Sequence, residues 1–235
     1  MKEGLVKQGL SAPEMGKINR YTRRAYTPEE VYAFSLVLCD NEVDRDWERF
    51  SLEALEGLRE LFPGKTLLFD HERRSASQTA RIYDTALETE PGKSTQAGEV
   101  YTKLTAKAYL PRTEKNREVI ELIESGILKE VSVGCSVARR VCSICGAEGG
   151  TCQHTPGQRY GEQLCYLELR EPTDAYEWSF VAVPAQPEAG VLQKSKAAGV
   201  LRKALAGQDR PMEALEQLER EAGLGRRYLE ELRKE

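Results

Sequence analysis

The stretch VIELIESGILKEVSVG, residues 119–134, combines two elements that decide the fold. Its first half has apolar residues at helical spacing, and Gly126 stands where a left-handed glycine commonly ends a helix. The residues at 128–141, LKEVSVGCSVARRV, are rich in β-branched side chains and predict a strand. We therefore expect a helix over 113–125 that leads directly into a strand.

The chain on either side of this stretch predicts one more helix and several strands. Leucines recur at helical spacing in 51–62, with Ser51 as N-cap and Pro63-Gly64 as the end of the helix. Apolar and β-branched runs predict strands at 31–39, 66–70, 80–88, 99–110, 162–170 and 175–183. The sum is an α+β fold, a mainly antiparallel β-barrel with flanking helices.

Composition divides the chain into three parts. Residues 1–28 are polar and locally basic, and we expect a flexible N-terminal arm. The main domain spans 29–190 and is interrupted by a cysteine-rich insertion at 141–166. The following residues, 191–235, are dominated by Ala, Leu, Glu, Lys and Arg, which predicts a helical C-terminal tail.

Charge and hydropathy exclude several classes of protein. The formal net charge is −4, which argues against a globally basic nucleic-acid binder. The apolar runs are only a few residues long, so we expect no membrane span, and the polar N-terminus has no apolar core of a secretory signal. We expect neither nucleic acid nor a membrane as a partner.

Four of the six cysteines lie in one short stretch, which indicates a metal site in a reducing compartment. Cys142 and Cys145, followed by a glycine, resemble a zinc knuckle, and Cys152 and His154 complete a set of four ligands. On a regular strand Cys152 and His154 would be too near each other for easy chelation, so Cys165 remains an alternative to His154.

A metal site closed by four protein ligands is structural. We therefore expect Zn²⁺ that folds a loop too polar and glycine-rich to form a core of its own. A set of buried, reduced cysteines in a polar loop is the alternative. A zinc-dependent hydrolase is disfavoured, because the ligand set leaves no open metal position.

His71 and Ser132 are candidates for catalysis. With His154 engaged by metal, His71 is the remaining histidine, at the end of an apolar strand where a general base would be held firmly. Ser132 and Ser136 alternate with valines, and Gly134 allows close approach of the backbone. A surface histidine and a plain polar strand face remain open from spacing alone. No G-x-S-x-G elbow supports an α/β-hydrolase.

Three blocks, in order, resemble a known family. They are Leu68-Phe69-Asp70-His71, the stretch 119–134 quoted above, and YEWSFVAVPAQPEA at 176–189. Together they are similar to the prohead (capsid maturation) proteases of tailed phages of the HK97 type, which share a fold with the herpesvirus assemblins. The resemblance spans roughly residues 30–190, so that 29–190 would be the protease domain.

The resemblance implies roles for individual residues. His71 would be the base and Ser132 the nucleophile, with Glu177 as the third member of the triad and Asp174 as second choice. An arginine pair, Arg139 and Arg140, would help to position the oxyanion donors. Two departures stand out: the cysteine insertion, and Cys135 where the family commonly has Phe. A thiol nucleophile at Cys135 is disfavoured, because it lies three positions from Ser132 and faces the other side of the strand.

The resemblance also implies a function. The chain would be a serine endopeptidase that removes the scaffolding segment of the major capsid protein, and cleaves itself, inside the phage procapsid in the host cytoplasm. A homodimer is expected by analogy with the herpesvirus enzymes. The alternative is a non-enzymatic phage assembly or scaffold protein that retains the protease fold.

Overall fold

The computed structural model describes residues 10–192. Three α-helices, α1 (Ala12–Asn19), α2 (Leu52–Leu61) and α3 (Arg117–Glu124), accompany ten strands in this part of the chain. The predicted helical tail lies outside the described residues from residue 193 onward. No helix among the described residues is long and apolar enough to cross a membrane.

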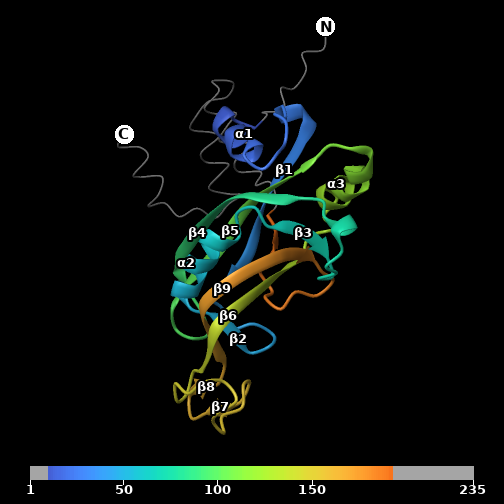
Figure 1. Cartoon of the computed structure of the whole chain (residues 1–235). Helices are drawn as coiled ribbons and strands as arrows, with labels where there is room; N and C mark the ends of the chain where they lie inside the picture. The colour runs from blue at the N-terminus through green and yellow to red at the C-terminus, as the bar shows by residue number, and fades with distance from the viewer. Residues whose placement is uncertain (1–9, 193–235) are drawn as a thin grey trace, which may run out of the picture. The chain divides into compact units, whose positions relative to one another are not determined.

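The main sheet of residues 10–192 is mixed and has eight strands (Figure 1). The pairing order is β10-β1-β5-β4-β3-β9-β2, with β6 paired to β9 in addition. Strands β2 and β3 run parallel to β9, and the other pairs are antiparallel. The strands are β1 (Val31–Asp40), β2 (Glu48–Phe50), β3 (Thr66–Phe69), β4 (Arg81–Ser94), β5 (Val100–Pro111), β6 (Val131–Cys142), β9 (Leu167–Phe180) and β10 (Gly190–Val191).

The α+β class is confirmed, but the expected closed, mainly antiparallel barrel is not found among residues 10–192. One isolated bridge, Glu130 to Gly190, joins the residues before β6 to β10. Between β9 and β10 the chain contains Pro184 and Pro187, which have no N–H to donate to a ladder. Strand β10 has only two residues, and beside this bridge only the Val131–Ala189 and Val191–Lys129 backbone hydrogen bonds join this part of the chain to the start of β6, so no ladder within the described residues closes the sheet.

Strand β9 is continuous where two separate strands were expected. It pairs with β6 along almost its whole length, from Val131↔Phe180 to Cys142↔Leu167. Two register shifts on the way absorb the irregularity near Pro172, and Glu171 next to it has a positive φ of 53°. Bulges of this kind allow a long strand to bend without ending.

Helix α2 covers β9 and supplies part of the core. It has the expected N-cap, since Ser51 accepts a hydrogen bond from the Ala54 N–H at 3.0 Å. Leu55 and Leu58 are fully buried in the cluster that includes Trp178. Gly57 leaves room for Pro172, because a Cβ there would lie 2.5 Å from the proline ring.

The expected flexible arm is wrong from Ala12 onward, because α1 is packed on the sheet. Ser11 and Glu14 form a capping box at its start. Met15 and Ile18 are buried in a second apolar cluster with Val31, Tyr83 and Tyr109. Burial of these side chains fixes the helix against β4 and β5.

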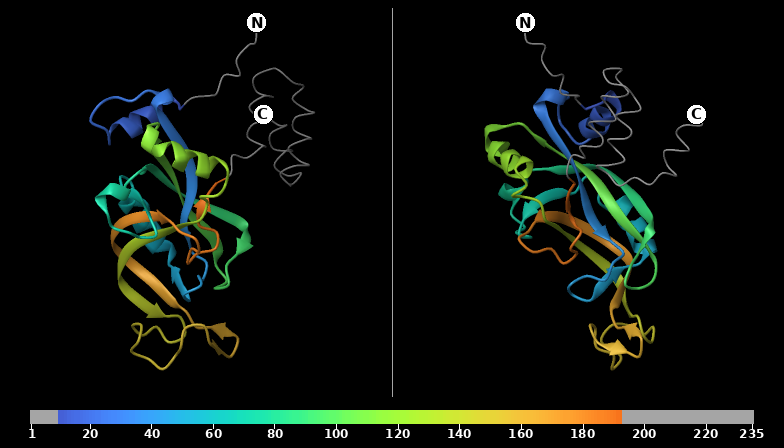
Figure 2. Two further views of the ribbon diagram at one scale, coloured as in Figure 1. Left: turned by 90° about the vertical axis from the view of Figure 1, so that its right-hand side faces the viewer. Right: turned by 180° about the vertical axis from the view of Figure 1, so that it is seen from behind.

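The cysteine-rich insertion forms a small module at the ends of β6 and β9, as two further views show (Figure 2). It contains the two-stranded ribbon of β7 (Arg159–Tyr160) and β8 (Gln163–Leu164). Its neighbour in the main domain is Trp47, whose ring would lie 2.7 Å from a Cβ at Gly157. The module is therefore packed against the main domain at this point.

Candidate active site and metal centre

His71 lies on a tight turn after β3. Its φ is 57° and that of Asp70 is 50°, so two successive non-glycine residues adopt the left-handed region. Such backbone costs on the order of 1–3 kcal/mol per residue and persists only where the surroundings hold it. Here the Asp70 N–H donates to the Phe180 carbonyl and the Glu72 N–H to the Phe69 carbonyl. The sheet thus fixes the direction of the His71 side chain.

The imidazole of His71 is hydrogen-bonded to Glu177, at 2.8 Å between Nδ1 and Oε1. The carboxylate side chain is only 4% exposed, whereas that of His71 is 41% exposed. In the tautomer with the proton on Nδ1, His71 donates to the Glu177 carboxylate and Nε2 is the acceptor. This arrangement suits a base that takes a proton from a hydroxyl group.

Ser179 completes this network, although the sequence analysis did not single it out. Its hydroxyl donates to Glu177 Oε2 at 2.6 Å and accepts from the His71 N–H at 3.1 Å. Ser179 is fully buried and lies opposite Leu68 of β3 in the parallel register. It therefore ties the carboxylate and the histidine turn to the same strand.

Gly134 provides the space that Glu177 occupies. The two residues lie directly opposite each other on β6 and β9. A Cβ on Gly134 would lie 2.2 Å from Glu177 Oε1, far closer than any real contact. This glycine, two residues after the candidate nucleophile, therefore makes room for a carboxylate of the protein itself.

Ser132 lies directly opposite Ser179 in the β6–β9 register. Directly paired residues project from the same face, so Ser132 shares the face of Ser179 and Glu177, at about 4.5–5.5 Å between Cβ atoms for the direct pair and about 7–8 Å for the diagonal one. No hydrogen bond joins Ser132 to His71 within residues 10–192. Catalytic hydrogen bonds are often long before substrate binds.

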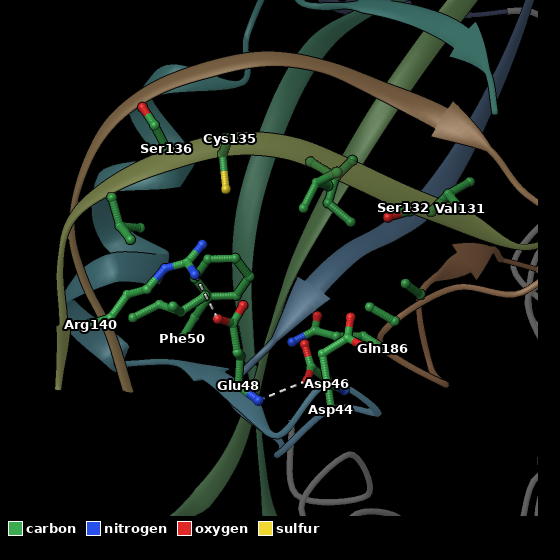
Figure 3. Close-up of a pocket in the computed structure, with 16 residues that line it drawn as sticks. Asp44, Asp46, Glu48, Phe50, Val131, Ser132, Cys135, Ser136, Arg140 and Gln186 are labelled. Atoms are coloured by element: carbon green, nitrogen blue, oxygen red, sulfur yellow. Dashed lines mark hydrogen bonds and ion pairs between the residues drawn. The ribbon is translucent and has the colours of Figure 1, made fainter. Parts of the chain in front are cut away.

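A cavity of about 380 Å³ lies along β6, and Ser132 lines it together with Val131, Val133, Cys135 and Ser136 (Figure 3). The Cys135 sulfur points into this cavity while the Ser136 hydroxyl points away from it. Burial raises the pKa of the Cys135 thiol to about 11, which suppresses the thiolate. Cys135 lines the same cavity as Ser132, but its suppressed thiolate makes it poorly suited to act as a nucleophile.

Other residues proposed for catalysis are engaged elsewhere. Asp174 forms an ion pair with Lys65 at 3.4 Å rather than a bond to His71. Arg139 pairs with Glu148 at 2.8 Å, and Arg140 pairs with Glu48 at 3.2 Å (Figure 3). Both arginines lie seven or more residues along β6 from Ser132, roughly 23 Å in an extended strand. Arg140 nevertheless lines the same cavity as Ser132, and a role of the two arginines near the oxyanion stays a prediction.

The cysteine module brings four candidate ligands together. The ligand atoms of Cys142, Cys145, Cys152 and His154 all lie within 4.8 Å of one another, so the group can hold a metal ion. Burial raises the pKa of Cys142, but hydrogen bonds from the backbone N–H groups of Cys145 and Ile144, with contacts to neighbouring thiols, lower it overall to about 6. Such N–H groups stabilise a thiolate.

The donor set contains an unpaired nitrogen that fits a metal. His154 Nδ1 is buried and has no hydrogen-bond partner among residues 10–192, while its ring makes an edge contact with Tyr160 at 4.6 Å between centroids. Cys152 lies on a bend and His154 in the irregular segment that follows it, so neither is on a regular strand and the objection that they are too close in sequence falls away. A metal ion would satisfy this nitrogen.

Cys165 lies beside the cluster but outside the group of four. Burial, followed by contact with the Cys142 thiol, raises its pKa to about 11. Its backbone bonds Gly157 and Gln158 and so holds the module's ribbon. The geometry favours His154 over Cys165 as the fourth ligand.

Comparison of the chain with protein-family models, with curated proteins and with solved structures finds no match.

Substitution of Gly134 by alanine tests whether the His71–Glu177 hydrogen bond depends on the absence of a side chain at this position. The new methyl group must displace the Glu177 carboxylate, so the Nδ1 proton of His71 should lose its downfield, hydrogen-bonded NMR signal. Glu177→Gln should weaken that signal as well, because the charge-assisted bond becomes a neutral one.

Gly92→Ala is the matched control, because a Cβ at Gly92 meets nothing within 4 Å. Its spectrum should equal that of the wild type. An unchanged His71 signal in folded Gly134→Ala would show that the carboxylate does not depend on this glycine.

Proposed function

We propose that the chain is a serine endopeptidase with Ser132 as nucleophile, His71 as base and Glu177 as the residue that orients the base. The observation that carries the proposal is the His71–Glu177 hydrogen bond on the face that Ser132 shares. A buried carboxylate that fixes the tautomer of a half-exposed histidine is the arrangement that activates a hydroxyl group.

The reaction would be acyl transfer. Ser132 Oγ attacks the peptide carbonyl while His71 Nε2 takes its proton, and the same nitrogen later gives that proton to the leaving amine. Glu177 stabilises the imidazolium formed in between, and Ser179 keeps the carboxylate in place. Water then hydrolyses the acyl-enzyme by the same route in reverse.

Within this class we propose a prohead maturation protease of a tailed phage. Support comes from the three sequence blocks, whose histidine and closing-strand glutamate lie within hydrogen-bond distance. The open sheet, with its bridge between Glu130 and Gly190, would then be a variant of the barrel of the herpesvirus assemblins. The substrates would be the scaffolding segment of the major capsid protein and the chain itself, inside the procapsid, and the active form a homodimer.

Co-expression with the neighbouring major capsid protein, followed by intact mass, tests this function. Wild type should trim the capsid protein, whereas Ser132→Ala and His71→Ala should leave it whole, because each removes a group that makes or moves the reacting bond. Losses of 10³-fold or more are expected.

Ser136→Ala is the control, because it removes a hydroxyl of the same strand that has no role in the proposed triad. The Ser136 hydroxyl is hydrogen-bonded to Thr173 at 2.7 Å, and Asp174 is the residue opposite Ser136 on β9. This variant should cleave as the wild type does. If the capsid protein has the same mass with the wild type and with all three variants, and the chains are folded, the result would favour the alternative, a non-enzymatic assembly or scaffold protein.

We propose further that the metal of the cysteine module is structural Zn²⁺, bound by Cys142, Cys145, Cys152 and His154. A soft, four-ligand set that contains three thiolates and one imidazole is typical of tetrahedral zinc. The ion would fold a module that has little apolar core of its own.

Metal analysis tests the zinc proposal. Wild type should contain about one zinc per chain, His154→Ala should contain much less, and Cys165→Ser should retain it. In a Trp178→Phe background, a chelator should change the fluorescence of Trp47, which packs on the module at Gly157. If His154→Ala retained zinc and Cys165→Ser lost it, the fourth ligand would be Cys165.

A further inference from the structure

A groove of about 480 Å³ opens beside the His71–Glu177 pair. Its lining includes Thr66 and Leu68 of β3, Ala175 and Glu177 of β9, and residues 73–75 of the loop that follows His71. This groove shares no lining residue with the cavity along β6 that Ser132 lines.

The strand register gives the groove a direction. Thr66 lies opposite Glu177, and Leu68 lies opposite Ser179, which bonds the His71 N–H. Lys65 and Asp174 mark the other end, where they form an ion pair. A peptide that lies along β3 and β9 would therefore have one end at the histidine and the other at Lys65.

Arg73 is the cation of this groove that no carboxylate neutralises in the described part of the chain. Its guanidinium lies over the ring of Tyr176, with Cζ 4.9 Å from the centroid. By contrast, Lys65 is paired with Asp174 and Arg74 with Glu72, each at 3.4 Å. Stacking on an aromatic face orients a guanidinium and leaves its N–H edge free.

The carboxylates in the lining do not neutralise Arg73 either. Glu177 is directed to His71 and Ser179 and is almost fully buried. Asp174 is held by Lys65 at the far end. The free guanidinium thus offers a fork of N–H donors of the kind that binds a carboxylate through two parallel hydrogen bonds.

We propose that this groove binds an acidic stretch of the substrate, with Arg73 receiving a glutamate or aspartate side chain. The inference rests on the proposed protease function and names its substrate class. Arg73 is two residues from His71, so the acidic residue would lie within about three positions of the scissile bond. Arg73 would be a specificity residue and not a catalytic one.

Peptide binding to full-length Ser132→Ala tests the proposal without any turnover. The probes are two fluorescein-labelled decapeptides, one with glutamate alternating with alanine and leucine, the other with glutamine in place of each glutamate. Fluorescence anisotropy should show binding of the glutamate peptide at least tenfold tighter, and salt should reduce the difference. Adding the Arg73→Glu substitution should abolish the preference for the glutamate peptide.

Two further variants keep the test specific. Arg117→Glu makes the same charge change on α3, where Arg117 pairs with Glu114 away from the groove, and should bind as its parent does. Arg73→Lys keeps the charge but loses the planar fork, so it should retain only part of the preference.

Equal affinity for the two peptides, or equal loss in Arg73→Glu and Arg117→Glu, would overturn the groove assignment. That result is distinct from failure of the protease proposal, which the co-expression experiment reports. A preference for the glutamate peptide that depends on Arg73 supports the groove even where no cleavage is seen.

Discussion

The pairing of β6 with β9 is the interaction on which the rest of the structure depends. One end of this antiparallel pair brings Ser132 and Gly134 opposite Ser179 and Glu177, and the other end carries the cysteine module. Because side chains alternate strictly along a strand, a slip of one residue would move Ser132 to the core face and away from His71. The core residues that fix the register, Trp178 and Phe180 on β9 and Val131 on β6, are therefore also what holds the candidate site in place.

The burial of Glu177 is the second constraint. A charge taken out of water is costly unless it is paired and hydrogen-bonded, and here both carboxylate oxygens have a partner. That requirement explains the small residue at Gly134, the buried hydroxyl of Ser179 and the left-handed turn at His71 as parts of one arrangement. Strained backbone persists only where the surrounding structure holds it, and such residues are common at functional sites, which is consistent with the turn at His71.

Local patterns predicted the helix at 51–62, most strands and the cysteine cluster, because each depends on periodicity or spacing within a short segment. Features that depend on partners far away in the sequence were missed. Ser179 is an ordinary serine within an apolar strand, and only the cross-strand register gives it a role. The predictions of a break in β9 near Pro172 and of a closed barrel were wrong for the same reason, because both features depend on pairing between strands far apart in the sequence. Helix α1 could have been read from its Ser11–Glu14 capping box, but the polar, basic surroundings favoured an arm.

The central claim is that His71 and Glu177 activate Ser132. Its most direct test is treatment of the full-length chain with a fluorophosphonate, which reacts covalently with an activated serine hydroxyl, followed by intact mass and peptide mapping. We expect a single phosphonyl adduct on the peptide that contains Ser132, and no adduct when His71 is replaced by alanine. A folded wild-type chain that gains no mass, or an adduct on another serine that survives His71→Ala, would contradict it.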